Sequence, residues 1–308
     1  MYKRFVTLLI LPFLFASCSK NSNQKVEKPS ILVSIAPYAF FAEKIAGDTL
    51  NIQTLIPPGT NIHIYEPSPR SVENNAHAVA WFRIDEPIEA PVVKALKERA
   101  PQMKMVNLQD GLPLMTGDGA IELTPYSDHH HHHDHHHHHD HHHHDHHHHH
   151  DRDLHTWVSP KLALKQAQMI TDTLIELFPE NAELYKKNFN DLMLNMVQLE
   201  SDISQKLAPF KGNAILVSHP AFGYFCRDYE LIQLSVECEG KEPRPKDVEN
   251  IVKRAQTYEV RCVFLQQGYD NRGAQLIGEK LQLPQYHVDP YARDYFSNMS
   301  KISGDIAK

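Results

Sequence analysis

Four side chains of the kinds that bind metal ions lie next to strand-like or helix-like segments of the chain. His63 lies in a turn-rich stretch after one apolar segment, and His155 lies just before a predicted helix. His219 lies between a strand-like and a helix-like segment, and Asp289 follows the last strand-like segment. Because ligands bind at the carboxyl ends of strands in open α/β sheets, these residues can meet at one site. Three neutral imidazoles and one carboxylate make a tetrahedral set that suits Zn²⁺.

A second group of histidines is concentrated in one segment. Nineteen of the 24 histidines lie between residues 129 and 150, interrupted only by aspartates. The segment has no hydrophobic residue to offset the entropy of ordering, so we expect a disordered loop over about residues 118–151. Its imidazoles offer many weak auxiliary metal sites. They are His129, His130, His131, His132, His133, His135, His136, His137, His138, His139, His141, His142, His143, His144, His146, His147, His148, His149 and His150.

Two more residues stand near the predicted ligands in the sequence. Glu66 follows His63 by three residues and could accept the second ring N–H of that imidazole, as an oxygen atom usually does beside a metal-bound histidine. His287 precedes Asp289 by two residues, so both would point to the same side of a strand. His287 could be a nitrogen ligand or an outer partner of the site, although we favour a structural role for it.

The composition excludes several classes of protein. Of the 308 residues, 41% are hydrophobic, and glycine and proline are near average, which indicates a folded chain with one unusual insert. The net charge of −7 argues against a nucleic-acid partner, because phosphate binding needs a basic face. Neither HExxH nor GxSxG occurs, and Glu66 is the one candidate base near a ligand motif, so a binding protein is favoured over a metal-dependent hydrolase.

The beginning of the chain has the pattern of a bacterial export signal. A short basic start precedes an apolar stretch at 5–15, which is too short to span a bilayer. The end of this pattern, FASC at 15–18, resembles a lipobox. That resemblance implies that residues 1–17 are removed as a lipoprotein signal peptide and that Cys18 carries a lipid. Residues 18–29 are polar and suit a tether between membrane and domain.

Three cysteines remain after Cys18, which allows one disulfide at most. The candidates are Cys226, Cys238 and Cys262, and the sequence does not choose the pair. None lies in a CxxC spacing, so a thiolate zinc site is disfavoured.

Short apolar segments alternate with helical patterns in both halves of the chain. The predicted strands of the first half are residues 31–35, 52–56, 78–84 and 104–108, and those of the second half are 214–217, 231–236, 262–266 and 285–288. The predicted helices among them are residues 39–46, 87–99, 221–229, 245–258 and 272–281. This alternation predicts two α/β lobes, each with a mostly parallel four-stranded sheet flanked by helices.

A long helix is predicted between the two halves. Residues 182–207 contain neither glycine nor proline, and apolar side chains repeat every three or four residues. At 1.5 Å per residue this helix is about 40 Å long, enough to run along both lobes. A shorter amphipathic helix at 160–178 precedes it. The predicted organisation is an N-terminal lobe at 30–181, a rigid linker helix at 182–208 and a C-terminal lobe at 209–308.

Several motifs along the chain resemble those of the solute-binding receptors of ABC importers for zinc and manganese. They are HIYEPSP at 63–69, LHTWVSP at 154–160, SHPAFGYF at 218–225, EGKEPRP at 239–245 and HVDP at 287–290. The resemblance covers nearly all of residues 30–308 and implies two α/β lobes joined by a long helix. It also implies that His63 and His155 are metal ligands from the first lobe, and that His219 and Asp289 are ligands from the second. The chain departs from the family at 266–269, where QQGY replaces the usual EPQF.

The resemblance implies that the protein is not an enzyme but a receptor that captures Zn²⁺ and delivers it to the membrane subunit of an ABC permease. Family members with a carboxylate in place of His219 are tuned to manganese, and imidazole-rich sites favour zinc. We therefore expect a monomeric, lipid-anchored zinc receptor on the periplasmic face or at the cell surface. The alternatives are a manganese or iron receptor of the same family and a zinc-storage or adhesion lipoprotein without a permease. The histidine-rich loop could capture scarce zinc, buffer excess zinc, or be passive.

Overall fold

The structure is a computed structural model that describes residues 28–116, 152–236 and 245–308. Several sequence-based expectations fall outside this part of the chain: the signal peptide, lipidation of Cys18, most of the tether at 18–29, the histidine-rich loop, most of the EGKEPRP motif, and any role of Cys238 in a disulfide. Within the described residues, no helix combines the length and the apolar character needed to cross a membrane.

The first lobe is built on a parallel four-stranded sheet. Its strands are β1 (Ser30–Val33), β2 (Asn51–Thr54), β3 (Ala80–Arg83) and β4 (Lys104–Asn107), in the order β2-β1-β3-β4. Its helices are α1 (Ala36–Ala46), α2 (Pro69–Asn75), α3 (Glu89–Arg99) and α4 (Pro160–Leu177). The inner strands β1 and β3 are almost wholly buried, as expected for a parallel sheet covered by helices on both faces.

The second lobe repeats this architecture. Its strands are β7 (Ala214–Val217), β8 (Ile232–Ser235), β9 (Val260–Gln266) and β10 (Gln285–Val288), all parallel, in the order β10-β9-β7-β8. Its helices are α6 (Gly223–Asp228), α7 (Pro245–Ala255), α8 (Arg272–Lys280) and α9 (Tyr295–Ile306). The predicted fold class, two parallel α/β lobes joined by a long helix, is therefore confirmed.

Short elements complete the chain. An antiparallel pair, β5 (Met115–Thr116) and β6 (Arg152–Asp153), flanks the segment that contains the histidine-rich loop. In the part of the chain that the structure describes, the 3-10 turns are η1 (Gly47–Thr49), η2 (Thr156–Val158), η3 (Pro179–Asn181) and η4 (Ala208–Phe210). The sequence did not predict β5, β6, α2 or α9.

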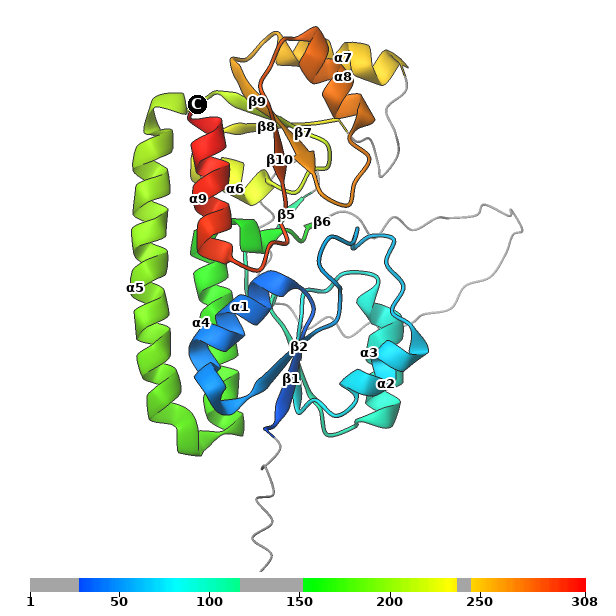
Figure 1. Ribbon diagram of the computed structural model, residues 1–308, viewed down its shortest axis with the longest axis vertical. Coiled ribbons are helices and arrows are strands. Elements are labelled where there is room, and N and C mark those ends of the chain that lie inside the picture. Colours follow the sequence, from blue (N-terminus) through cyan, green and yellow to red (C-terminus); the bar gives the residue numbers. More distant parts are fainter. Residues whose placement is uncertain (1–27, 117–151, 237–244) are drawn as a thin grey trace, which may run out of the picture.

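The linker helix α5 (Ala182–Leu207) has 26 residues and runs along both lobes (Figure 1). It contacts α1 and α4 of the first lobe and α9 of the second. Its buried face repeats at intervals of three and four residues, as an amphipathic helix requires. The buried residues are Tyr185, Phe189, Leu192, Met196, Leu199, Ile203 and Leu207.

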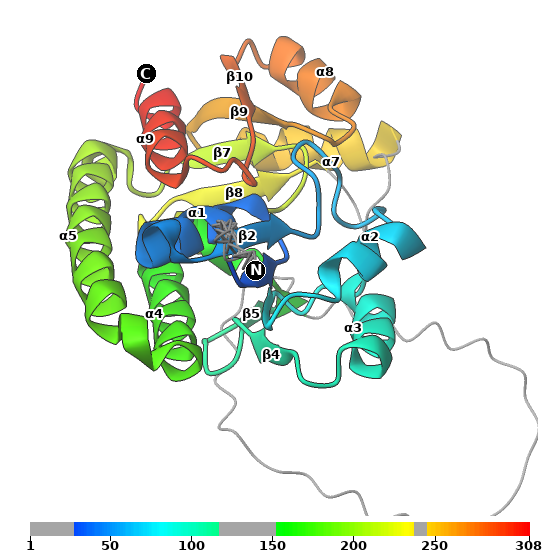
Figure 2. The same cartoon turned by 60° about the horizontal axis from the view of Figure 1, so that its bottom comes forward.

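The two lobes share one hydrophobic core on the side of α5. Phe41 of α1 and Tyr295 of α9 lie with ring centroids 4.8 Å apart, and Phe40 and Phe296 lie 5.4 Å apart. Helices α4, α5 and α9 gather on this side, while α2, α3, α7 and α8 lie on the opposite one (Figures 1 and 2). The aromatic contacts join the lobes firmly here, and both sheets direct their carboxyl ends toward the region between the lobes.

Candidate metal centre

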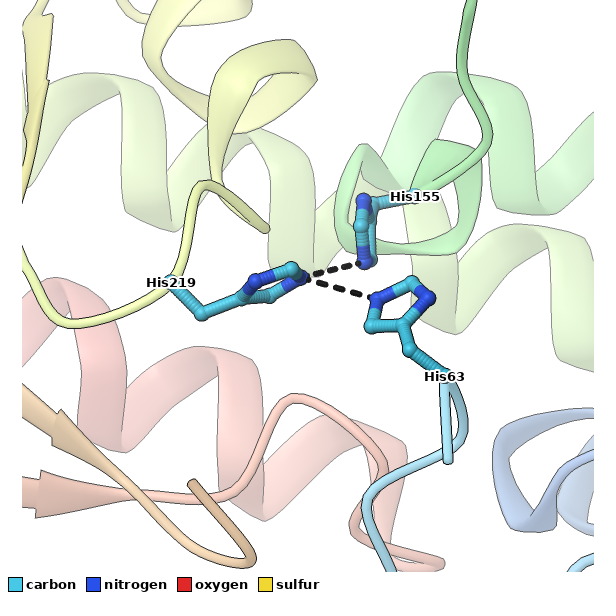
Figure 3. Close-up of side chains that lie close together, drawn as sticks. All are labelled: His63, His155 and His219. Carbon is cyan, nitrogen blue, oxygen red and sulfur yellow. Dashed lines mark hydrogen bonds between the residues drawn. The ribbon is translucent and has the colours of Figure 1, made fainter. Parts of the chain in front are cut away.

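Three imidazoles from three separate segments meet between the lobes (Figure 3). The Nε2 atom of His219 lies 3.1 Å from Nε2 of His63 and 3.3 Å from Nε2 of His155. The ligand atoms of all three residues lie within 4.8 Å of one another. Nitrogen ligands at 2.0–2.1 Å from a tetrahedral Zn²⁺ are about 3.3 Å apart, so two of the spacings already match those of a zinc site.

The position of His155 is set by the residue two places before it. Asp153 ends β6, and its Oδ1 atom lies 2.8 Å from Nδ1 of His155 and accepts the backbone N–H of His155 at 2.9 Å. Tyr224 of the second lobe donates its hydroxyl to the carbonyl of Asp153 at 2.7 Å and accepts the N–H of Met115. This arrangement holds Nδ1–H toward the carboxylate and leaves the Nε2 lone pair directed at the other imidazoles.

The position of His63 depends on a carboxylate from another part of the chain. Glu86 follows β3, is buried, and places Oε2 3.5 Å from Nδ1 of His63. Burial opposes ionisation of Glu86, but its hydrogen bond to His63 and the nearby imidazoles outweigh that cost and lower the pKa of the carboxyl. Glu66, the residue that the sequence suggested for this role, is exposed. Glu86 could have been noticed because it lies two residues after the end of the predicted strand at 78–84.

His219 follows β7 and is 6% exposed. Its backbone N–H donates to Oε1 of Gln266 at 2.6 Å, and its ring is stacked on Tyr269 with centroids 4.4 Å apart and planes 16° apart. Both partners belong to the QQGY segment at 266–269, where the sequence departs from the family. This segment therefore forms the immediate surroundings of His219.

The structure places the other candidate residues outside the group of three imidazoles. Asp289 directly follows β10, is half-buried, and accepts the backbone N–H of Tyr291 at 2.9 Å through Oδ1. Burial raises the pKa of Asp289, and that hydrogen bond partly offsets the effect. His287 is exposed on β10, and its backbone carbonyl accepts a hydrogen bond from Lys301. Among the described residues, the group that could hold a metal ion thus contains His63, His155 and His219.

The carboxylate contacts of two imidazoles indicate what the three ring nitrogens can bind. Where Glu86 and Asp153 hold the Nδ1–H groups of His63 and His155, both of these rings present an Nε2 lone pair to Nε2 of His219, which carries at most one proton. The Nε2 lone pairs of the three rings can therefore point at one position among them. A cation among them would satisfy all three lone pairs.

Trp157 lies beside the site, and two buried cysteines belong to α6 and β9 of the second lobe. Trp157 is fully buried, donates its indole N–H to the carbonyl of Pro290 at 2.9 Å, and lies 5.2 Å from the ring of His155. Cys226 and Cys262 are buried free thiols, so they do not form a disulfide with each other. Burial raises the pKa of Cys262 to about 12, which keeps this thiol protonated and unreactive.

Comparisons with known proteins agree with the geometry of the site. The family model described as "Zinc-uptake complex component A periplasmic" (ZnuA) matches residues 31–308. A protein of Chlamydia trachomatis serovar D, described only as a candidate metal-binding protein, is 31% identical over 300 residues, which cover 97% of this chain and 98% of the relative.

Two further relatives are named for zinc. The zinc-binding lipoprotein AdcA of Streptococcus pneumoniae strain R6 is 29% identical over 240 residues, which cover 77% of this chain and 44% of AdcA. A crystal structure of a ZnuA deletion mutant with zinc bound superimposes with a TM-score of 0.76 at 27% identity, covering 91% of this chain and 97% of that one.

The family match runs through both lobes, the linker helix and all three clustered imidazoles. It confirms the expectation of a binding protein rather than an enzyme. The chain belongs to the ZnuA family, the periplasmic zinc-uptake components that serve as solute-binding proteins of ABC importers.

Proposed function

We propose that this protein binds Zn²⁺ between its two lobes through the Nε2 atoms of His63, His155 and His219. The observation that supports this most directly is the convergence of three imidazole nitrogens, with two spacings of 3.1 and 3.3 Å, from both halves of the chain. An all-nitrogen group of this kind binds Zn²⁺ more tightly than Mn²⁺. The zinc named in the descriptions of AdcA and of the ZnuA structure supports the same cargo.

Asp289 is our proposed fourth ligand. It follows β10 at the carboxyl edge of the second sheet, and its carboxylate is half-buried. A carboxylate oxygen would complete a tetrahedral set and would offset part of the charge of the ion. Glu66 and His287 remain candidates for the outer shell only, and Glu86 and Asp153 are added to that shell as partners of the imidazoles.

A competition titration tests the site. Zn²⁺ and Mn²⁺ are titrated against a chromophoric chelator, with protein that lacks residues 129–150 so that the loop contributes no sites. Replacing His63 or His219 with alanine should weaken zinc binding by at least about 100-fold, more than the loss of an outer-shell partner causes. Asp289→Ala should weaken it less, because three imidazoles remain.

His77→Ala is the matched control, because His77 is exposed in the turn between α2 and β3. Parent-like zinc affinity in both His63→Ala and His219→Ala would overturn the ligand assignment. Equal affinity of the parent for Mn²⁺ and Zn²⁺ would point to a manganese or iron receptor instead.

The proposal extends to the role of the protein in the cell. Export, a lipid at Cys18 and transfer of Zn²⁺ from a monomeric receptor to an ABC permease are supported by the signal-like sequence at 1–18 and by membership of the ZnuA family. A strain without its own receptor but with the matching permease should regain growth at limiting zinc when it expresses this protein. Failure to regain growth would indicate a storage or adhesion lipoprotein. Cys18→Ala should release the protein from the membrane fraction.

For the histidine-rich loop we propose capture of scarce zinc and its transfer to the central site. Tethering many weak sites near one strong site raises the local concentration of the ion. Imidazoles bind metal only when neutral, so binding by the loop should weaken below about pH 6.5. Deletion of residues 129–150 should reduce uptake only when zinc is scarce, and unchanged uptake at limiting zinc would contradict capture.

A further inference from the structure

A single buried amide links the two loops that carry the carboxylates of the site. Gln109 lies beyond β4 and is 4% exposed. Its Nε2 group donates to the carbonyl of Ile84 at 3.2 Å and to the carbonyl of Leu154 at 2.9 Å. Ile84 lies two residues before Glu86, and Leu154 lies between Asp153 and His155. Gln109 thus contacts both segments that orient an imidazole.

The other end of the Gln109 side chain is held as firmly. Its Oε1 atom accepts the hydroxyl of Thr156 at 2.9 Å, and Nε2 of Gln166 in α4 donates to the same hydroxyl at 2.8 Å. Gln166 also donates to the carbonyl of Leu108 at 3.1 Å. Both amide hydrogens and the amide oxygen of Gln109 therefore have partners, which fixes the amide in one orientation.

Hydrogen bonds to a second side chain, Glu89, also hold the loop that carries Glu86. The buried carboxylate of Glu89 accepts the N–H of Ile84 at 3.0 Å and the N–H of Asp85 at 2.9 Å. Asp85 has φ of 63°, a left-handed conformation that a non-glycine residue keeps only where its surroundings enforce it. Glu89 therefore accepts the N–H of Ile84, while Gln109 donates to the carbonyl of the same residue. The strained turn at Asp85 then directs Glu86 at His63.

We propose that Gln109 is a positioning residue that sets the distance between the Glu86–His63 pair and the Asp153–His155 pair. The proposal rests on the function proposed above, because it assigns Gln109 to the same zinc site. Its physical basis is that Glu86 and the Asp153–His155 pair lie far apart in sequence, and the amide of Gln109 is a direct hydrogen-bonded link between the backbones at residues 84 and 154. Without that link, each pair would remain intact but their separation would vary.

The test is Gln109→Met, which keeps the length of the side chain and removes its hydrogen bonds. We expect zinc affinity to fall by about tenfold, at the lower end of the range for outer-shell changes. We also expect the visible spectrum of bound Co²⁺ to change, because that spectrum reports the ligand geometry. Thr171→Val is the matched control, since the buried hydroxyl of Thr171 bonds only within α4, to the carbonyl of Ala167.

A double-mutant cycle separates positioning from general destabilisation. In protein that carries both Glu86→Gln and Asp153→Asn, Gln109→Met should reduce affinity by less than about threefold, because the pairs that it positions are already weakened. An undiminished tenfold loss in that background would overturn the proposal. So would a Co²⁺ spectrum that stays the same as that of the parent, or an equal loss of affinity in Thr171→Val.

If Gln109→Met fails to fold, Thr156→Val provides a second test, because the hydroxyl that it removes donates to the amide oxygen of Gln109 and also accepts from Gln166. Parent-like affinity and spectrum in that variant would then overturn the proposal.

The failure of this inference is distinct from failure of the zinc site. Loss of binding in His63→Ala, together with unchanged binding in Gln109→Met, would contradict the role of Gln109 alone. Parent-like binding in both His63→Ala and His219→Ala would contradict the site itself.

Discussion

In the first lobe, Glu86 and Asp153 lie against the Nδ1 atoms of His63 and His155, at 3.5 and 2.8 Å. In the second lobe, His219 is stacked on the ring of Tyr269, and its backbone is held by Gln266. A carboxylate fixes the ring tautomer and makes the imidazole a stronger ligand, whereas a stacked ring fixes its plane. The first lobe therefore supplies two carboxylates that favour a cation beside its imidazoles, whereas the second lobe holds its imidazole by ring stacking and a backbone hydrogen bond.

The largest effect that bears on this comparison should come from His219→Ala, which removes the second lobe's imidazole from the cluster. We expect zinc affinity to fall by at least about 100-fold, beyond the range for outer-shell partners. Chelator competition measures the change, with His77→Ala as the control outside the site. A loss smaller than that caused by Asp153→Asn would mean that the first lobe binds the ion by itself.

Loss of a carboxylate partner should have the next largest effect. Asp153→Asn and Glu86→Gln should each weaken zinc binding by about 10- to 100-fold. Asp153→Asn should cost more, because its contact with the imidazole is shorter, at 2.8 rather than 3.5 Å. Glu66→Gln tests the competing partner of His63, and it should weaken binding less because Glu66 is exposed. If it weakened binding as much as Glu86→Gln, the assignment of the partner of His63 would be wrong.

A smaller effect concerns the pH dependence of folding of the metal-free protein. Burial raises the pKa of Glu89 in the first lobe from 4.5 to about 7, although hydrogen bonds to Ser34 and Ile84 favour its ionised form. Between pH 4.5 and about 7, the Glu89 carboxyl keeps its proton in the folded protein but has lost it in the unfolded chain. Glu89 therefore makes the free energy of unfolding decrease as pH rises, by up to about 1.4 kcal/mol per pH unit.

Urea unfolding between pH 5 and 8 measures this slope, which Glu89→Gln should reduce.

Asp305 in the second lobe provides the opposite case. Burial opposes its ionisation, but hydrogen bonds from Lys301 and Lys308 outweigh that cost and lower its pKa. The stabilisation of the folded protein by ionised Asp305 is present above the ordinary pKa of an aspartate and is lost as pH falls. Asp305→Asn should therefore leave the slope above pH 5 unchanged, and the same slope in Glu89→Gln as in the parent would contradict the prediction.

The smallest effect should come from the stacked ring in the second lobe. Tyr269→Leu should weaken zinc binding by about three- to tenfold, because an aromatic pair contributes about 0.5–1.5 kcal/mol beyond burial. Tyr269→Phe keeps the ring and loses the 3.3 Å contact with the hydroxyl of Tyr291, so it should bind like the parent. An equal loss in both variants would show that the hydroxyl, rather than the stacking, matters for His219.

Much of the fold could be predicted because its elements have strong local signals. The strands β7 and β10 and the helix α5 begin and end at the predicted residues, since each combines a clear apolar period with turn-forming or helix-breaking neighbours. The missed helices have weak signals. α2 has seven residues and follows a proline-rich segment, and α9 contains serine and glycine residues of low helix propensity. Both depend on tertiary contacts.

The sequence by itself determined which residues could bind a metal, because imidazoles at the ends of strand-like segments are visible without any structure. Only the tertiary structure decided which of them meet, and it grouped His63, His155 and His219 without Asp289. It also decided that Glu86 faces His63 and that Gln109 links two distant loops. The reason is physical: local periodicity reports how a segment folds, whereas contacts between residues far apart in sequence depend on how whole elements pack.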